Sequence, residues 1–186
     1  MRIIGGKSKG KKIKLPNDNT TRPLRDLVKE SIFNLLEHSN KFNTSISNSN
    51  ILDLFSGTGS FGLECFSRGA KFITFIENYS EALRILKKNI IILDATKDTN
   101  IIEKSCFEYF ELNKKIKDKF DIIFLDPPYK EDKINFLIEK IKDNQLLKKN
   151  GVLIIHRHKK DELKITSKLN IVDKRSYGIS KIVIGN

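Results

Sequence analysis

Short apolar runs alternate with amphipathic segments from residue 50 to residue 186, and this alternation limits the fold more than any other feature. The expected strands are Ile51–Phe55, Phe72–Glu77, Asn100–Glu103, Phe120–Leu125, Gly151–Arg157, Asn170–Lys174 and Lys181–Ile184. The expected helices between the first five strands are Ser60–Ser67, Ser80–Leu93, Phe107–Lys117 and Lys133–Lys142. Continuous apolar strands separated by helices are typical of a parallel sheet covered on both faces. We therefore predict a three-layer α/β fold with a mostly parallel seven-stranded sheet whose last strand is antiparallel.

The N-terminal part of the chain has a different pattern. Residues 1–16 contain six Lys or Arg residues and no acid, and they predict a basic hairpin around a glycine-containing turn. Residues 24–37 have apolar residues at helical spacing, and residues 38–49 form a polar linker rich in Ser and Asn. We therefore divide the chain into an N-terminal extension, residues 1–49, and an α/β domain, residues 50–186.

Composition excludes several classes of protein. The 35 Lys and Arg residues outnumber the 23 Asp and Glu residues, giving a net charge of +12 that favours a polyanionic partner, nucleic acid before an anionic membrane. Cys65 and Cys106 form no CxxC pair, which argues against a disulfide scaffold or structural zinc and suits the cytoplasm. No apolar run is long enough to span a bilayer. His156 and His158 lack a third ligand nearby, so we expect surface histidines and no metal site.

The first predicted strand leads into a glycine-rich segment, DLFSGTGSFG, from Asp53 to Gly62. This segment contains the spacing GxGxxG, and Glu77 ends the second predicted strand. A glycine turn between a strand and a helix, followed by an acid at the end of the next strand, is typical of sites for nucleotide cofactors. The alternative is that Asp53 is a turn residue and Glu77 an ordinary acid at a strand end.

Charge decides which cofactor this segment prefers. Asp53 would repel the pyrophosphate of NAD, which needs a neutral or positive site. S-adenosylmethionine has no phosphate but carries an ammonium and a sulfonium, and Glu77 can accept hydrogen bonds from both ribose hydroxyls. We therefore predict an S-adenosylmethionine site that contains Asp53, Gly57, Gly59 and Glu77.

The fourth predicted strand ends in Asp126-Pro127-Pro128-Tyr129, which should face the same crevice as the glycine loop. Asp126 and the Pro127 carbonyl can each accept a hydrogen bond from an exocyclic amine, while Tyr129 can stack on the base that carries it. The lone pair of an aromatic amine is delocalised, so two such acceptors would restore its nucleophilicity. The segment therefore predicts methyl transfer to the amine of a base.

These motifs together resemble those of the RsmD-type 16S rRNA guanine-N2 methyltransferases. The matching segments are Arg2-Ile-Ile-Gly-Gly6, Gly10-Lys-Lys, Arg22-Pro23, Glu30-Ser-Ile-Phe-Asn34, Leu52-Asp-Leu-Phe-Ser-Gly-Thr-Gly59, Gly62-Leu-Glu64, Ser67-Arg-Gly-Ala70 and Asp126-Pro-Pro-Tyr129. The resemblance implies a Rossmann-like methyltransferase fold that modifies N2 of a guanine in 16S rRNA, on an assembled or partly assembled 30S particle. Two positions depart from the family pattern, because Leu24 replaces a threonine and Ser105-Cys106 replaces Asp/Asn-Ala.

The resemblance also implies roles for individual residues. The cofactor site would gain Phe55, Asn78, Ser105, Cys106 and Asp126. The resemblance places Arg22 beside the crevice. The charge of the acid-free N-terminal segment adds Lys7, Lys9, Lys11 and Lys12, and we predict that these residues hold the RNA together with Tyr129. The catalytic residues would be Asp126, Pro127 and Tyr129. We expect a monomer that binds no membrane.

Two other functions remain open from the sequence. A DNA adenine-N6 methyltransferase shares the Asp-Pro-Pro-Tyr segment and acts on a flipped base, but it generally needs a separate recognition domain. A catalytically silent RNA-binding assembly factor would not need Asp53, Glu77 and Asp126. A protein glutamine methyltransferase would normally carry Asn at position 126.

Overall fold

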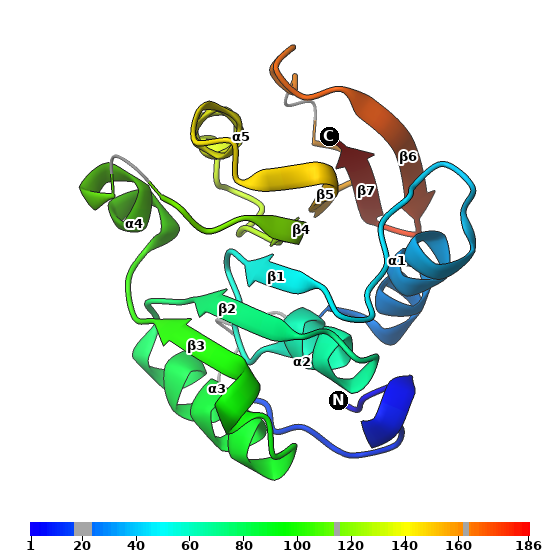
Figure 1. Cartoon of the computed structure of the whole chain (residues 1–186), viewed down its shortest axis with the longest axis vertical. Helices are drawn as coiled ribbons and strands as arrows, with labels where there is room; N and C mark the ends of the chain where they lie inside the picture. The colour runs from blue at the N-terminus through cyan, green and yellow to red at the C-terminus, as the bar shows by residue number, and fades with distance from the viewer. Residues whose placement is uncertain (17–23, 114–115, 162–163) are drawn as a thin grey trace.

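A seven-stranded sheet with helices on both faces forms the body of the protein (Figure 1). The computed structural model describes residues 1–16, 24–113, 116–161 and 164–186. The strands are β1 (Asn50–Asp53), β2 (Phe72–Ile76), β3 (Thr99–Ile102), β4 (Phe120–Leu125), β5 (Leu147–His158), β6 (Ile171–Tyr177) and β7 (Ser180–Gly185). The helices are α1 (Asp26–His38), α2 (Ser60–Ser67), α3 (Ser80–Ile92), α4 (Cys106–Leu112) and α5 (Ile134–Asp143), with short 3₁₀ turns η1 (Gly6–Ser8) and η2 (Thr96–Asp98).

The strand order is β3-β2-β1-β4-β5-β7-β6, and β7 runs in the direction opposite to that of the other six strands of this sheet. The predicted fold, a Rossmann-like α/β fold with an antiparallel last strand, is confirmed. Every predicted strand is present, although β5 begins at Leu147 rather than Gly151 because its pairing with β4 shifts register near Phe120. Helix α4 ends at Leu112, earlier than its predicted end at Lys117.

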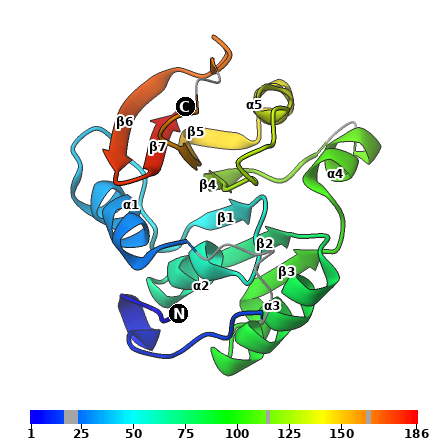
Figure 2. The same ribbon diagram turned by 180° about the vertical axis from the view of Figure 1, so that it is seen from behind.

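Two hydrophobic clusters separate the layers. Seen from opposite sides in Figures 1 and 2, α4 and α5 lie on one flank of the sheet, and α1 and α2 lie on the other. Alternate strand residues point to opposite faces. Thus Ile122 and Phe124 pack in the cluster with α1, α2 and α3, whereas Ile123 and Leu125 pack with α4 and α5. None of the helices in the described ranges is long and apolar enough to cross a membrane.

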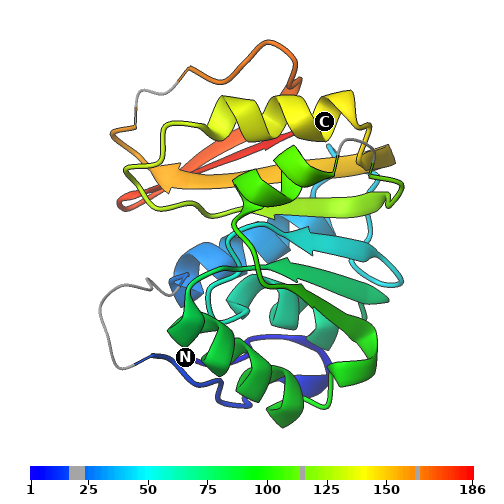
Figure 3. The ribbon, with the colours of Figure 1, turned by 90° about the vertical axis from the view of Figure 1, so that its left-hand side faces the viewer.

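Strand order reverses between β1 and β4, which are parallel neighbours. Chain connections leave these two strands in opposite directions, so their loops part and open a crevice at the carboxyl ends. Figure 3 shows the arrowheads of β4 and β5 on the same side of the molecule. The glycine loop after β1 and the Asp126–Tyr129 segment after β4 therefore meet at one edge of the sheet, as predicted.

The N-terminal segment, residues 1–16, lies along α2 rather than standing apart from the body. Arg2 and Lys12 form one antiparallel bridge, in partial agreement with the predicted hairpin, and η1 occupies its turn. Ile3 and Ile13 are buried in the same hydrophobic cluster as α1 and α2. Hydrophobic burial thus joins the segment to the sheet domain.

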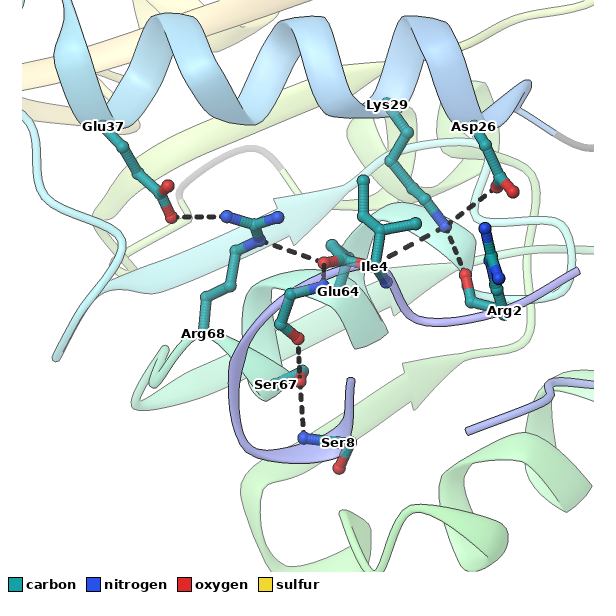
Figure 4. A network of polar contacts seen from close by, with 10 residues as sticks. Arg2, Ile4, Ser8, Asp26, Lys29, Glu37, Glu64, Ser67 and Arg68 are labelled. Atoms are coloured by element: carbon teal, nitrogen blue, oxygen red, sulfur yellow. Dashed lines mark hydrogen bonds and ion pairs between the residues drawn. The ribbon is translucent and has the colours of Figure 1, made fainter. Parts of the chain in front are cut away.

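A buried polar network also holds this segment in place (Figure 4). The Glu64 carboxylate in α2 accepts hydrogen bonds from the backbone N–H groups of Ile4 at 2.9 Å and Gly5 at 2.7 Å. Two cations flank it: Lys29 Nζ lies 3.6 Å from Glu64 Oε2 and Arg68 Nε lies 3.0 Å from Oε1. Because the Lys29 and Glu64 side chains are both fully buried, these bonds replace the water that the two charges lose.

Candidate active site

A crevice of about 950 Å³ opens at the switch point between β1 and β4. The glycine loop, the end of β2, the start of α4 and the Asp126–Tyr129 segment all contribute to its wall. Ligands bind at this position in open α/β sheets. The crevice is therefore the candidate active site.

The glycine loop reaches into the crevice through an unusual backbone. Gly57 and Gly59 have φ angles of 53° and 84°, in the left-handed region that favours glycine. Gly62 lies where α2 crosses β2, and a Cβ there would come within 2.3 Å of the Phe75 ring. Phe55 adopts a φ of 128°, a strained conformation for a residue with a side chain, and it lines the crevice.

Asp53 is buried beneath the glycine loop, at 1% exposure. Its Oδ2 accepts a hydrogen bond from Gly62 N at 3.1 Å. Desolvation by burial raises the pKa of Asp53 to about 8, partly opposed by that hydrogen bond and aided by the charges of Asp126 and Glu77. A cation in the crevice would stabilise the ionised form.

Glu77 follows β2 and ties the rim of the crevice together. Its Oε2 accepts from Gly57 N at 2.7 Å, and its Oε1 accepts from the backbone N–H groups of Asn78 and Tyr79. These bonds fix the carboxylate in one orientation beside the glycine loop. A carboxylate has four lone-pair sites, so the fixed group can still accept from a ligand hydroxyl.

The start of α4 forms the opposite wall. Ser105 is the N-cap of this helix, with its Oγ accepting from Glu108 N at 3.1 Å, and Cys106 is buried. Burial raises the pKa of the Cys106 thiol to about 12, so the thiol is protonated and not a nucleophile. Phe107 packs edge-on against Phe55 at a ring-centroid distance of 6.3 Å. All the predicted cofactor residues except Gly59, which is the N-cap of α2, line one crevice.

The Asp126–Tyr129 segment faces the glycine loop across the crevice. Asp126 is partly exposed, with 21% of its side chain accessible, and Pro127 is buried. Within the described ranges, no donor occupies the Pro127 carbonyl, whereas the Pro128 carbonyl accepts from Glu131 N and Arg157. Two acceptors therefore lie side by side in sequence at the crevice wall.

Two residues of β5 that were not predicted from the sequence, His156 and Arg157, support this segment, and the prediction that His156 is a surface histidine is wrong. His156 is 6% exposed and its Nδ1 lies 2.7 Å from Asp126 Oδ1. Arg157 is buried as well and donates to the carbonyls of Pro128 and Tyr129, both at 3.2 Å. Polar residues at the carboxyl end of an otherwise apolar central strand were the available signal.

The predicted RNA-contacting residues divide into two groups. Tyr129 lies at the crevice and packs edge-on against His158 at a centroid distance of 5.2 Å. Lys7, Lys9, Lys11 and Lys12 are exposed on the N-terminal segment, and none of these four lines the crevice. Gly6 contacts Ser67 at the far end of α2, roughly 10.5 Å along the helix from Ser60. Arg22 lies outside the described residues.

Comparison with known proteins identifies the family of this chain. The family model described as "Conserved hypothetical protein 95" matches residues 1–186. Ribosomal RNA small subunit methyltransferase D from Buchnera aphidicola subsp. Baizongia pistaciae is 33% identical over 182 residues, covering 98% of this chain and 88% of the relative. The chain belongs to this family. The resemblance to the RsmD-type family is thereby confirmed.

Solved structures support the fold of this RsmD-type chain. The protein YhhF from Escherichia coli has a TM-score of 0.84 at 24% identity, covering 100% of this chain and 96% of that one. A longer protein, described as a methyltransferase and solved in complex with SAH, has a TM-score of 0.62 at 19% identity. That match covers 85% of this chain and 49% of the other. Both likenesses concern the fold.

Proposed function

We propose that this RsmD-type protein transfers a methyl group from S-adenosylmethionine to the exocyclic N2 amine of a guanine in 16S rRNA. The substrate is an assembled or partly assembled 30S particle, and the protein acts on it as a monomer in the cytoplasm. The observation that carries the proposal is the crevice in which Asp53 and Glu77 face Asp126 and Pro127. The name of the Buchnera relative, a small-subunit rRNA methyltransferase, supports the class of substrate.

S-adenosylmethionine fits the charge of this crevice. Among the described residues, four acids line it: Asp53, Glu77, Asp126 and Glu131. Three cations, Arg25, Lys104 and Lys130, line it as well. Asp53 and Glu77 adjoin the glycine loop through their hydrogen bonds to Gly62 N and Gly57 N, and at that loop they disfavour a phosphate-bearing cofactor. The cofactor's cations would favour the ionised form of Asp53, while the fixed Glu77 carboxylate accepts from the ribose. The SAH complex of a protein with the same fold is consistent with this choice.

The reaction needs little more than positioning and hydrogen-bond acceptors. The amine nitrogen of guanine attacks the methyl carbon, the carbon–sulfur bond breaks, and its electron pair stays on sulfur. Asp126 and the Pro127 carbonyl accept hydrogen bonds from the amine, which disperses the positive charge that develops on nitrogen. The amine then loses one proton through Asp126 to water, and Tyr129 holds the base by stacking.

The substrate itself can be tested directly. Purified protein is given donor with a labelled methyl group and one of three acceptors: 30S particles, naked 16S rRNA or double-stranded DNA. We expect label in N2-methylguanosine after digestion of the RNA, with 30S particles the best acceptor. Label in N6-methyladenine of DNA would overturn the substrate. No label in any acceptor, with donor binding intact, would indicate a silent RNA-binding factor.

Variants of the Asp126–Tyr129 segment test the chemistry. Asp126→Ala should abolish methyl transfer while donor affinity stays nearly intact, because its bonds to the amine matter most in the transition state. Asp126→Asn keeps one acceptor oxygen and should retain partial activity. The matched control is Asp132→Ala, which removes an exposed acid from the same loop. If stacking is the role of Tyr129, Tyr129→Phe should be mild and Tyr129→Ala severe, and equal losses would assign the role to the hydroxyl.

A further inference from the structure

His156 connects the reactive carboxylate to the edge of the sheet. It lies at the carboxyl end of β5, where its Nδ1 is 2.7 Å from Asp126 Oδ1 and its Nε2 is 2.8 Å from Ser180 Oγ. Ser180 begins β7 and is 3% exposed. Three side chains, one from the loop after β4 and one each from β5 and β7, thus form one continuous chain of hydrogen bonds that ends at the crevice.

From this geometry we infer that His156 and Ser180 are positioning residues for methyl transfer. The inference rests on the proposed function, because it concerns the carboxylate that accepts the amine. The Ser180 hydroxyl donates to His156 Nε2, which leaves the proton of the imidazole on Nδ1, and Nδ1–H donates to Asp126 Oδ1. Asp126 Oδ1 is then occupied, and Oδ2 is left for the amine of the base.

The partial exposure of Asp126 explains why its carboxylate needs such support. Asp126 is partly exposed, so without a partner its side chain would sample several rotamers. An imidazole that is held on both sides limits the carboxylate to one orientation. An acceptor displaced by about 1 Å costs on the order of 100-fold in rate, because the reacting atoms must be aligned.

The same atoms are joined in the Ser-His-Asp triad of hydrolases, but the roles here run in the opposite direction. In a hydrolase the serine is open to substrate and the aspartate is buried. Here Ser180 is buried, and Asp126 is the member that is open to the crevice. The serine therefore serves as a hydrogen-bond donor, and no acyl-enzyme chemistry is expected from this arrangement.

Two amide substitutions separate the two bonds of His156. The amide nitrogen of Asn can replace Nδ1, and that of Gln can replace Nε2. We expect His156→Asn to keep at least a third of the single-turnover rate at saturating donor and RNA. His156→Gln and His156→Ala should lose about 100-fold, with unchanged KM for both substrates. Ser180→Ala should lose less than His156→Ala. His38→Ala, on the exposed end of α1, is the control.

Two further measurements keep the inference falsifiable. Once Asp126 is already Asn, adding His156→Ala should cost less than threefold, because a positioning residue acts through its partner. Nitrogen NMR of the imidazole should show the Nδ1-protonated tautomer in the wild type and a mixture of tautomers in Ser180→Ala. An Nε2-protonated wild type, or a wild-type rate in a folded His156→Ala variant, would overturn the inference. Failure of all acceptors to take label would instead overturn the proposed function, while the tautomer result would still stand.

Discussion

Binding of the cationic methyl donor should expel a proton from Asp53. In the free protein, burial raises the pKa of Asp53 to about 8, so the side chain is mainly protonated at neutral pH. A donor that carries an ammonium and a sulfonium binds best to the ionised form. The free energy of ionising Asp53 therefore weakens donor binding, and the size of this cost depends on pH.

The magnitude follows from the difference between pKa and pH. Each unit is worth about 1.4 kcal/mol, so ionisation costs roughly 1.4 kcal/mol at pH 7 and roughly 2.8 kcal/mol at pH 6. Donor affinity should consequently rise about tenfold from pH 6 to pH 7 and level off near pH 8. The α-amino group of the donor has an ordinary pKa of about 7.7–8.0, so it is mainly protonated from pH 6 to pH 7 and begins to lose its charge near pH 8, where the affinity levels off.

Calorimetry in buffers of different ionisation enthalpy measures the proton directly. At pH 7 we expect release of close to one proton per donor bound. Asp53→Asn keeps an oxygen for Gly62 N–H but cannot ionise, so its donor affinity should be weaker at pH 8, by ~1–3 kcal/mol, and nearly independent of pH. Equal pH dependence in the two proteins would refute the reasoning, because the released proton would then come from another group.

The same pKa shift predicts how stability depends on pH without donor. The folded-state pKa of about 8 lies above the ordinary value of 3.8, so between these two values the folded state binds more protons than the unfolded state. Stability should therefore fall as pH rises from 4 to 8. From pH 5 to 7.5 the wild type should lose about 3 kcal/mol more unfolding free energy than Asp53→Asn, as measured by urea denaturation.

Two further predictions concern the ligands. Glu77→Ala should weaken donor binding by ~1–3 kcal/mol in calorimetry, because a charged acceptor is lost, and an unchanged affinity would remove Glu77 from the cofactor site. Replacing Lys7, Lys9, Lys11 and Lys12 with Ala should flatten the salt dependence of binding to 30S particles by up to ~4 units of slope. If the slope is unchanged, a triple variant of the crevice-lining cations Arg25, Lys104 and Lys130 will show whether the RNA is held at the crevice alone.

The architecture was predictable because it depends on patterns of apolar residues that repeat over a few positions of the sequence. Apolar runs and helical spacing gave the order of the elements, and the rule for switch points placed Asp53 and Asp126 at one crevice. The spacing of the glycines and the position of Glu77 added the rest of the predicted cofactor site. None of these steps requires knowing which individual polar atoms meet.

The contacts that were not predicted depend on which polar side chains of neighbouring strands lie close enough to form a hydrogen bond. His156 reaches Asp126 because the register of β5 on β4 pairs Ile155 with Leu125, which brings the next residue of each strand together. The sequence showed two histidines on one strand face but did not show what lay opposite them. Similarly, the acid-free N-terminal segment was predicted as a basic hairpin in an extension of the sheet domain, although Ile3 and Ile13 bury it against the body. Charge composition shows what is exposed only after the packing is known.

Glu64 is part of a family motif, and its role in this structure is to hold the N-terminal segment in place. It belongs to the matching segment Gly62–Glu64, and its carboxylate holds the Ile4 and Gly5 backbone far from the reacting atoms. Glu64→Gln should lower the unfolding free energy by ~3–5 kcal/mol, because it leaves Lys29 and Arg68 beside an uncharged partner. The matched control is Glu81→Gln, which breaks a solvent-accessible pair with Arg84 and should cost less than about 1 kcal/mol.

The double variant Lys29→Met/Glu64→Gln separates charge from packing. It removes the buried cation together with its partner, so it should recover part of the stability lost in Glu64→Gln. Urea denaturation at pH 7 measures the unfolding free energy of the wild type, of Glu64→Gln, of the control Glu81→Gln and of the double variant. If Glu64→Gln is as stable as the wild type, the network does not hold the N-terminal segment, and burial of Ile3 and Ile13 alone must do so. If the double variant is less stable than Glu64→Gln, the Lys29 bond to the Arg2 carbonyl at 2.7 Å contributes more than the ion pair.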